Sequence, residues 1–170
     1  MKKDSLRSVM GVLEGGGVRF LVAGGLAVNA HGLLRFTADV DIVLQLVPEN
    51  VRRAFAALGT LGYRPIVPVT AEGFADAATR GGWIRDKGMR VLQFRSDNHR
   101  TVTVDVFVEE PFAFDEEYER ALKKELRGGT TVRFVSFETL LRMKAAAGRA
   151  QDLADIEQLK RRMKNDEYGE

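Results

Sequence analysis

The sequence predicts an α/β (α+β) fold, in which helices pack against a mixed β-sheet. Two kinds of segment alternate along the chain. Short runs rich in β-branched and aromatic residues are typical of strands, and apolar residues that recur every three or four positions are typical of helices. The clearest strands lie at 20–22, 39–46 and 101–108, and the clearest helices at 3–14, 48–58 and 136–159. Such an alternation builds a sheet that is covered by helices.

The composition narrows the class of protein. At 170 residues the chain is long enough for a sizeable core, and we expect a single domain over 1–170. A hydrophobic content of 45% argues against disorder, and a net charge of +2 does not indicate a nucleic-acid binder. The lack of cysteine excludes disulfides and thiolate metal sites. No apolar run reaches transmembrane length, so we expect a cytoplasmic protein with no membrane partner.

The acidic pair Asp39 and Asp41 opens the strand at 39–46. Residues two apart on a strand share one face, so both carboxylates project from the face opposite Val40 and Ile42. At roughly 6 to 7 Å apart, they repel by roughly 2 to 3 kcal/mol at an effective dielectric constant near 20. A hard divalent cation would offset this repulsion, which indicates an ion-binding face. A solvated pair at a strand edge is the alternative.

A phosphate cradle is predicted just before that strand. The segment 20–22 is followed by Gly24-Gly25 and a short helix, and free N–H groups at a helix start attract anions that glycine lets approach closely. Gly24-Gly25 is alternatively a tight turn and nothing more. The cradle and the acidic pair together indicate a site for a metal-bound nucleotide.

These motifs carry a resemblance to a known family. Ala23-Gly24-Gly25 with Asp39-Val40-Asp41 resembles the signature of the nucleotidyltransferase superfamily, the fold shared by DNA polymerase beta, aminoglycoside nucleotidyltransferases and toxin-type nucleotidyltransferases. Arg35-Phe36-Thr37 resembles the Arg-x-Thr/Ser element of small prokaryotic members, including toxin-like members related to the abortive-infection family. The resemblance spans 18–108, which we take as the core, and is weaker in a helical C-terminal segment over 136–165.

The middle of the chain contains less regular segments. We expect a helix at 48–58, an edge strand at 63–69 interrupted by Pro65 and Pro68, and a short helix at 71–79. A hairpin is predicted over 83–95, with its turn near Asp86-Lys87-Gly88. The strand at 101–108 then alternates valines on one face with Asp105 on the other. Asp105 is either one more exposed polar residue or the third carboxylate that the resemblance implies.

The last third of the chain is predicted to be mostly helical. We expect a charged helix at 115–126, a turn and short strand at 126–135, a helix from Ser136 towards Gly148, a further helix, and a fraying end over 160–170. Lys144, Arg149, Asp152 and Asp155 resemble a Lys…Arg-x-x-Asp-x-x-Asp element of small toxin-like nucleotidyltransferases. Asp152 either belongs to a charged helical face or holds Arg149 in place.

The resemblance implies a bacterial enzyme that transfers a nucleoside monophosphate from an NTP to an acceptor hydroxyl and uses Mg²⁺ or Mn²⁺. Asp39, Asp41 and Asp105 would be the catalytic and metal-binding residues. The nucleotide would be held by Gly24, Gly25, Arg35, Thr37, Lys144 and Arg149. The acceptor is an RNA end, a protein or a small molecule. The alternatives are a non-catalytic module that binds a protein partner or a nucleotide, for example one half of a toxin–antitoxin pair, and an RNA-binding protein.

Overall fold

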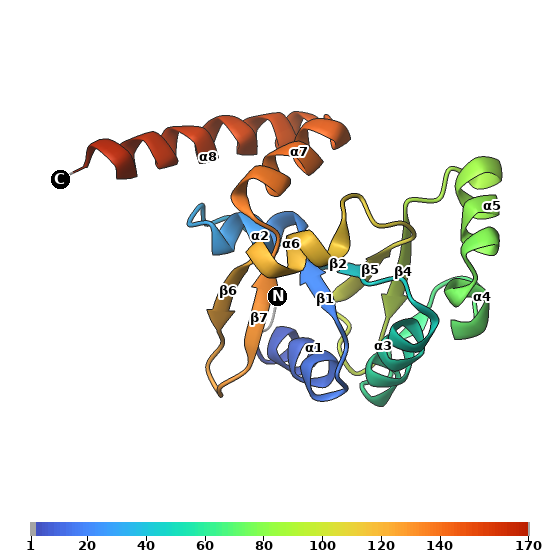
Figure 1. The fold of residues 1–170 in the computed structure, drawn as a ribbon. Coiled ribbons are helices and arrows are strands. Elements are labelled where there is room, and N and C mark those ends of the chain that lie inside the picture. The colour runs from blue at the N-terminus through green and yellow to red at the C-terminus, as the bar shows by residue number, and fades with distance from the viewer. Residues whose placement is uncertain (1–2, 170) are drawn as a thin grey trace.

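A seven-stranded mixed sheet organises the chain in the computed structural model, which describes residues 3–169 (Figure 1). The strand order is β3-β4-β5-β2-β1-β7-β6. The pairs β1–β7 and β2–β5 are parallel and the other four are antiparallel. The strands are β1 Phe20–Val22, β2 Asp39–Leu44, β3 Arg64–Pro65, β4 Val91–Arg95, β5 Thr103–Phe107, β6 Leu122–Glu125 and β7 Thr131–Phe134.

The helices divide between the two faces and the two ends of this sheet. They are α1 Lys3–Gly15, α2 Gly24–Ala30, α3 Pro48–Thr60, α4 Ala71–Ala75, α5 Ala77–Lys87, α6 Phe114–Arg120, α7 Phe137–Ala147 and α8 Ala150–Tyr168. Helices α1 and α3 pack side by side, α2 packs on β2 and α7, and α4 and α5 lie at the opposite end of the molecule from α7 and α8 (Figure 1). The predicted mixed sheet with helices and a helical C-terminal segment is therefore confirmed.

One face of the central strands forms the core. Val40 pairs with Val104 and Ile42 with Val106 in the parallel register of β2 and β5. All four side chains are at most 1% exposed, and they belong to the same buried cluster as Leu13 of α1 and other apolar side chains of α1 and α3. Because each such side chain contributes about 1.5 to 3 kcal/mol on burial, the alternation along β2 and β5 fixes which face carries the acids.

Several predicted elements agree with the structure. The helix predicted at 3–14, the strand at 20–22, the helix at 48–58 and the helix from Ser136 to Gly148 are present within a residue or two. Ser136 accepts a hydrogen bond from the backbone of Thr139, and Gly148 ends α7 in the left-handed conformation at φ 64°. The proline-interrupted segment 63–69 forms only the short edge strand β3, as expected.

The predicted hairpin over 83–95 is wrong. Residues up to Lys87 belong to α5, and only Val91–Arg95 forms a strand. Asp76 caps α5 by accepting the N–H of Thr79, and Gly88 closes it with φ 60°. The sequence Asp86-Lys87-Gly88 is thus a helix end and not a hairpin turn. The prediction was wrong because a glycine in the left-handed conformation occurs both at helix ends and in turns.

The helix predicted at 115–126 is also wrong in its second half. Helix α6 ends at Arg120 and the chain continues into β6. Glu117, expected on an exposed face, is fully buried and accepts hydrogen bonds from the backbone of Ser136 and the hydroxyl of Thr139. A buried carboxylate needs such donors, and these attach α6 to the start of α7.

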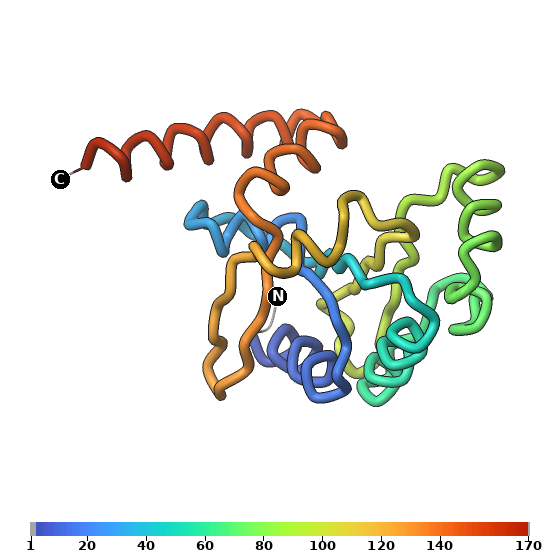
Figure 2. Tube along the Cα trace, in the orientation of Figure 1, coloured from blue at the N-terminus to red at the C-terminus, as the bar shows by residue number. Residues whose placement is uncertain are grey.

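The end of the chain differs from the fraying segment expected over 160–170. Helix α8 continues to Tyr168, and its second half extends beyond the rest of the molecule (Figure 2). Glu170 lies outside the described residues. The ion pair between Glu157 and Arg161 has the spacing that stabilises an exposed helix. Within residues 3–169, no helix is long and apolar enough to cross a membrane.

Candidate active site

The acidic residues lie in two rows that cross the sheet. Asp41 of β2 pairs with Asp105 of β5, which pairs in turn with Gln93 of β4. In the next row, Asp39 of β2 pairs with Thr103 of β5. Paired residues of adjacent strands point to the same face, so these side chains all project from the face opposite the valine core.

Neutral side chains donate hydrogen bonds to the carboxylates of Asp39 and Asp105, the two outer acids of the site. Thr103 Oγ1 donates a hydrogen bond to Asp39 Oδ1, and Gln93 Nε2 donates one to Asp105 Oδ1 at 3.0 Å. Gln93 Oε1 accepts from Arg95 Nε at 3.2 Å. This second contact fixes the orientation of the Gln93 amide, because a flipped amide would face the guanidinium with a donor. Asp39 and Asp105 each keep a second oxygen free of these contacts.

The crowding of carboxylates changes their proton affinity. The pKa of Asp41 is raised from its ordinary 3.8 to about 6. Burial is the largest cause, Asp105 and Asp39 add to it, and the charges of Arg149 and Lys144 oppose it. Burial also raises the pKa of Asp105, while the Gln93 hydrogen bond lowers it. The carboxylates on this face therefore repel one another when ionised, and a bound cation would reduce that repulsion.

The two glycines bring the backbone of α2 against this face. Gly24 has φ 61°, and a Cβ atom there would overlap Asp41 Oδ2 and lie 2.7 Å from Asp41 Cγ. A Cβ atom on Gly25 would lie 2.8 Å from Thr37 Oγ1 and 3.2 Å from an Arg35 nitrogen. Such distances are too short for any side chain, so both positions require glycine for close packing, and Gly24 also for its backbone conformation.

A network of ion pairs, largely buried, lies beside the three aspartates of the sheet. Lys144 of α7 is 5% exposed, and its Nζ lies 3.2 Å from Asp152 Oδ1 and 2.8 Å from Asp155 Oδ2. Asp155 also accepts from Arg35 NH1 at 2.8 Å, and Asp152 from Arg149 Nε at 2.7 Å. The five charges alternate in sign from Arg35 to Arg149 and join the segment before β2 to α7 and α8.

These contacts decide the charge states of the two aspartates. Burial alone would raise the pKa of both carboxyl groups, but the hydrogen bonds and charges around them hold each pKa below its ordinary value. For Asp152 the donors are Arg149 and Lys144, and for Asp155 they are Lys144, Gln151 and Arg35. Asp152 therefore does hold Arg149, one of the two alternatives left open by the sequence.

All nine predicted site residues line one cavity of about 620 Å³. Its volume is in the range of small-molecule sites. The floor is formed by the three aspartates of β2 and β5, and the cations of α7 and α8 lie on one side. The predicted residues that line it are Gly24, Gly25, Arg35, Thr37, Asp39, Asp41, Asp105, Lys144 and Arg149.

Sequence reasoning missed several residues of this site. Gln93 and Thr103 contact the outer carboxylates, and only the strand register shows that they do. Asp155 belongs to the C-terminal element named from the sequence, but its contacts, which join Lys144 to Arg35 across 120 residues, were not predicted. The apolar wall was also missed. It is formed by Ile84, Met89, Phe107, Pro111, Leu140 and Met143.

The donor chemistry of the acidic face fits a divalent ion. The available ligands are carboxylate oxygens, as Mg²⁺ and Mn²⁺ prefer, and burial and the neighbouring carboxylates raise the pKa of Asp41 despite the opposing charges of Arg149 and Lys144. Within the described residues, no three His, Asp or Glu side chains converge closely enough to form a complete metal site. Thr103 and Gln93 each engage one oxygen of Asp39 and Asp105, which leaves the other oxygen of each carboxylate for an ion.

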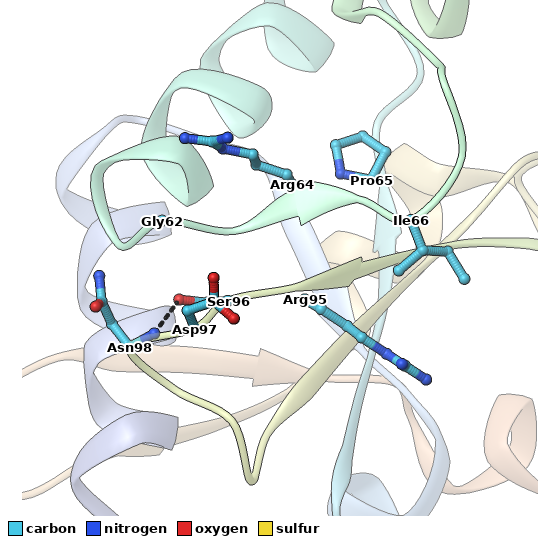
Figure 3. A pocket seen from close by; sticks show the side chains of 8 residues that line it. All are labelled: Gly62, Arg64, Pro65, Ile66, Arg95, Ser96, Asp97 and Asn98. Carbon is cyan, nitrogen blue, oxygen red and sulfur yellow. Dashed lines mark hydrogen bonds between the residues drawn. The ribbon is translucent and has the colours of Figure 1, made fainter.

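A second hollow, of about 440 Å³, lies at the β3 edge of the sheet (Figure 3). It contains Arg64 and Arg95, but Figure 3 shows their guanidinium groups pointing in opposite directions. Ser96 is engaged by the backbone N–H of Asn98 and donates to a backbone carbonyl. Because its cations do not converge, this hollow offers no anion site, and no predicted residue lines it.

Comparisons with known proteins identify a family and a fold. Residues 11–168 match the family described as nucleotidyl transferase AbiEii toxin, type IV TA system. Among solved structures, ANT(2″)-Ia in complex with adenylyl-2″-tobramycin has a TM-score of 0.58 at 13% identity, over 94% of this chain and 88% of the other. Lincomycin-bound LnuA, a lincosamide antibiotic adenylyltransferase, has a TM-score of 0.62 at 14% identity, over 94% and 97%. At such identities the likeness shows the fold. No curated protein matches the chain.

Proposed function

The chain belongs to the AbiEii family of nucleotidyl transferase toxins and is a nucleotidyltransferase, and on that premise we propose the reaction and the residues that carry it out. A nucleoside monophosphate is transferred from an NTP to an acceptor hydroxyl, and pyrophosphate is released. The observation that carries this proposal is the arrangement of one cavity, in which Asp39, Asp41 and Asp105 face the cationic side chains of Lys144 and Arg149.

The three aspartates are proposed to hold Mg²⁺ or Mn²⁺. Asp41 is the central ligand because it lies opposite Asp105 and follows Asp39 on the same face, and burial and these two neighbours raise its pKa. A divalent ion bound there neutralises phosphate charge and lowers the pKa of the attacking hydroxyl. Asp105, whose Oδ1 is held by Gln93, keeps Oδ2 for the ion or for the proton of the hydroxyl.

The triphosphate is proposed to lie on the cationic side of the cavity. The backbone of Gly24 packs directly against Asp41, so the free N–H groups at the start of α2 lie beside the proposed metal ligands, where they are proposed to bind the phosphates. Arg149 has a largely exposed side chain beside the buried Lys144, while Arg35 and Thr37 lie next to Gly25. These groups stabilise the charge that develops on the departing pyrophosphate.

Membership in a type IV toxin–antitoxin family supports two further proposals. The reaction takes place in the cytoplasm of a bacterium, where NTPs are available. The activity is balanced by an antitoxin. The antitoxin is a protein, and the proposal does not depend on its binding this chain.

The test is an assay for transfer. Purified protein is incubated with Mg²⁺, each α-labelled NTP and bacterial extract as the source of acceptors, and pyrophosphate and labelled product are measured. We expect both products from one or more NTPs, and neither from the Asp41→Asn variant. Asp166→Asn, an equivalent change on the exposed end of α8, is the matched control and should behave as wild type. Transfer by a folded Asp41→Asn protein would contradict the proposal.

A further inference from the structure

The cavity has two chemically different ends. The triphosphate is proposed to bind at one of them, and the other has no ligand assigned to it. The cationic end is built by elements that follow β1 and β7, namely α2, α7 and α8, and here the apolar Leu140 and Met143 lie beside Lys144 and Arg149. The other end is built by the last turn of α5, the residues before β4 and the end of β5. In the strand order the acidic strands β5 and β2 separate β4 from β1 and β7, so the two ends lie on opposite sides of the carboxylates.

The second end is apolar and nearly neutral. Phe107 lies two residues after Asp105 on the same face of β5, and Val91 pairs with it from β4. Ile84, Met89 and Pro111 complete the apolar lining, and all three line the same cavity as the aspartates. Arg90 and Glu109 are the charged residues of this end, and their charges cancel. Of these side chains, Ile84, Met89 and Phe107 are only partly buried, so they present apolar surface to the cavity.

The stereochemistry of phosphoryl transfer assigns the two ends. The attacking and leaving oxygens lie roughly in line across the phosphorus atom. Because pyrophosphate leaves towards Gly24, Lys144 and Arg149, the attacking hydroxyl must approach from the opposite side of the carboxylates. That side is the end lined by Met89 and Phe107.

We propose that this end is the acceptor subsite, and that it takes a hydroxyl group carried beside an uncharged ring, as in an aryl glycoside or a nucleoside. The proposal rests on the proposed function, because the direction of attack follows from where pyrophosphate leaves. The ring packs on Met89 and Phe107, and its hydroxyl reaches Asp105. A polycationic acceptor fits poorly, since Glu109 is the one acidic residue of this end and Arg90 opposes it.

The test uses small probes with the nucleotide end filled. Saturation-transfer NMR is recorded on the protein with Mg²⁺ and α,β-methylene-ATP, and with phenyl β-glucoside, methyl β-glucoside, uridine or tobramycin. The two glucosides differ in the aromatic ring, and uridine tests whether a nucleoside supplies it. We expect binding of phenyl β-glucoside or uridine at least about tenfold tighter than that of methyl β-glucoside, because burying a ring contributes free energy of that order. Tobramycin should bind no better than methyl β-glucoside.

Matched variants locate the binding. Met89→Glu and Phe107→Ala should each weaken the binding of the ring-bearing probe. Met163→Glu, which makes the same change as Met89→Glu at an exposed position of α8, should leave that binding unchanged. Equal binding of the ring-bearing probe by wild type and by folded Met89→Glu and Phe107→Ala overturns the proposal. Tighter binding of tobramycin than of either ring-bearing probe also overturns it. Failure of α,β-methylene-ATP and of the corresponding GTP, CTP and UTP analogues to bind, each measured from its own signals, would instead contradict the proposed function.

Discussion

Asp41 lies directly opposite Asp105 in the parallel pairing of β2 and β5, two positions along from Asp39 on the same strand face. Burial, together with these two neighbours, raises the pKa of Asp41 from 3.8 to about 6. A shift of this size corresponds to about 3 kcal/mol against the ionised form in the folded protein. The protein therefore tolerates a destabilising carboxylate at the centre of its candidate site.

The first prediction concerns stability without metal. The folded protein holds the proton of Asp41 more tightly than the unfolded chain does, so between pH 3.8 and about 6 it binds more protons and the contribution of Asp41 to stability falls as pH rises. Asp41→Asn removes the charge. We expect the variant to melt at a higher temperature than wild type at pH 8 in EDTA, and the difference to disappear near pH 4. A lower melting temperature than wild type at pH 8 would contradict this prediction.

The second prediction concerns metal and nucleotide together. If the aspartates bind Mg²⁺, then Mg²⁺ with an NTP should raise the melting temperature of wild type by mass action. Asp41→Asn should lose that increase and remain folded. Thermal unfolding at increasing Mg²⁺ concentration, with each NTP present, measures the effect. The same increase in the variant as in wild type would remove Asp41 from the metal site.

The extent of sequence prediction varies from one part of the chain to another. Strand β5 was predictable because Val104 and Val106 alternate with polar residues, and a strand has only two faces. The hairpin predicted at 83–95 failed because Gly88 in a left-handed conformation ends a helix as readily as it forms a turn. Local pattern does not distinguish the two, and the packing of Trp83 against Phe74 of α4 favours the helix.

The candidate site shows the same limit. Gly24, Gly25, Asp39 and Asp41 were predictable as a group because they lie within one short stretch, where strand period and the resemblance act together. Asp105 lies on a strand distant in the sequence and was included because of the resemblance. The contact of Asp155 with Arg35 and the hydrogen bond from Gln93 to Asp105 depend on strand order and on the placement of α8. Neither follows from spacing along a single element.

The third prediction concerns the glycine cradle. Gly25 lacks the positive φ of Gly24, so a side chain is tolerated by its backbone and excluded by Thr37 and Arg35. Gly25→Val should therefore displace the segment that lines the cavity and weaken NTP binding more than it lowers the melting temperature. Gly82→Val, in a helix where a Cβ meets nothing within 4 Å, is the matched control and should leave affinity unchanged. Unchanged NTP affinity in folded Gly25→Val would end the cradle hypothesis.

The fourth prediction separates buried from exposed ion pairs on α8. Asp155 is 2% exposed and contacts both Lys144 and Arg35, whereas Glu157 is exposed and pairs with Arg161. Asp155→Asn removes the carboxylate that pairs with Arg35 and one of the two that pair with the buried Lys144, and should destabilise the protein by about 3 kcal/mol or more. Glu157→Gln should cost at most about 1 kcal/mol. Urea unfolding measures both, and equal effects would show that the buried network does not hold α8 in place.

The last prediction concerns Asp105. If it is a solvated residue of a strand face, Asp105→Asn should change stability by no more than about 0.5 kcal/mol and leave turnover unaffected. If it serves the acceptor, the change should keep or raise stability, because it removes a charge from a crowded face, and lower turnover by about two orders of magnitude. Nucleotide affinity should survive better than in Asp41→Asn. Wild-type turnover in Asp105→Asn would remove this residue from the site.

Gln93 supplies the control for that experiment, because its hydrogen bond to Asp105 predicts that it affects turnover through the orientation of that carboxylate. Gln93→Leu should lower turnover by about tenfold in the wild-type background, with little change in nucleotide affinity. In the Asp105→Asn background the same change should have almost no effect, since two residues that act as one unit are not additive. A loss of turnover from Gln93→Leu that is equal in both backgrounds would show that Gln93 acts on the fold, and the orientation of Asp105 would then have to come from elsewhere.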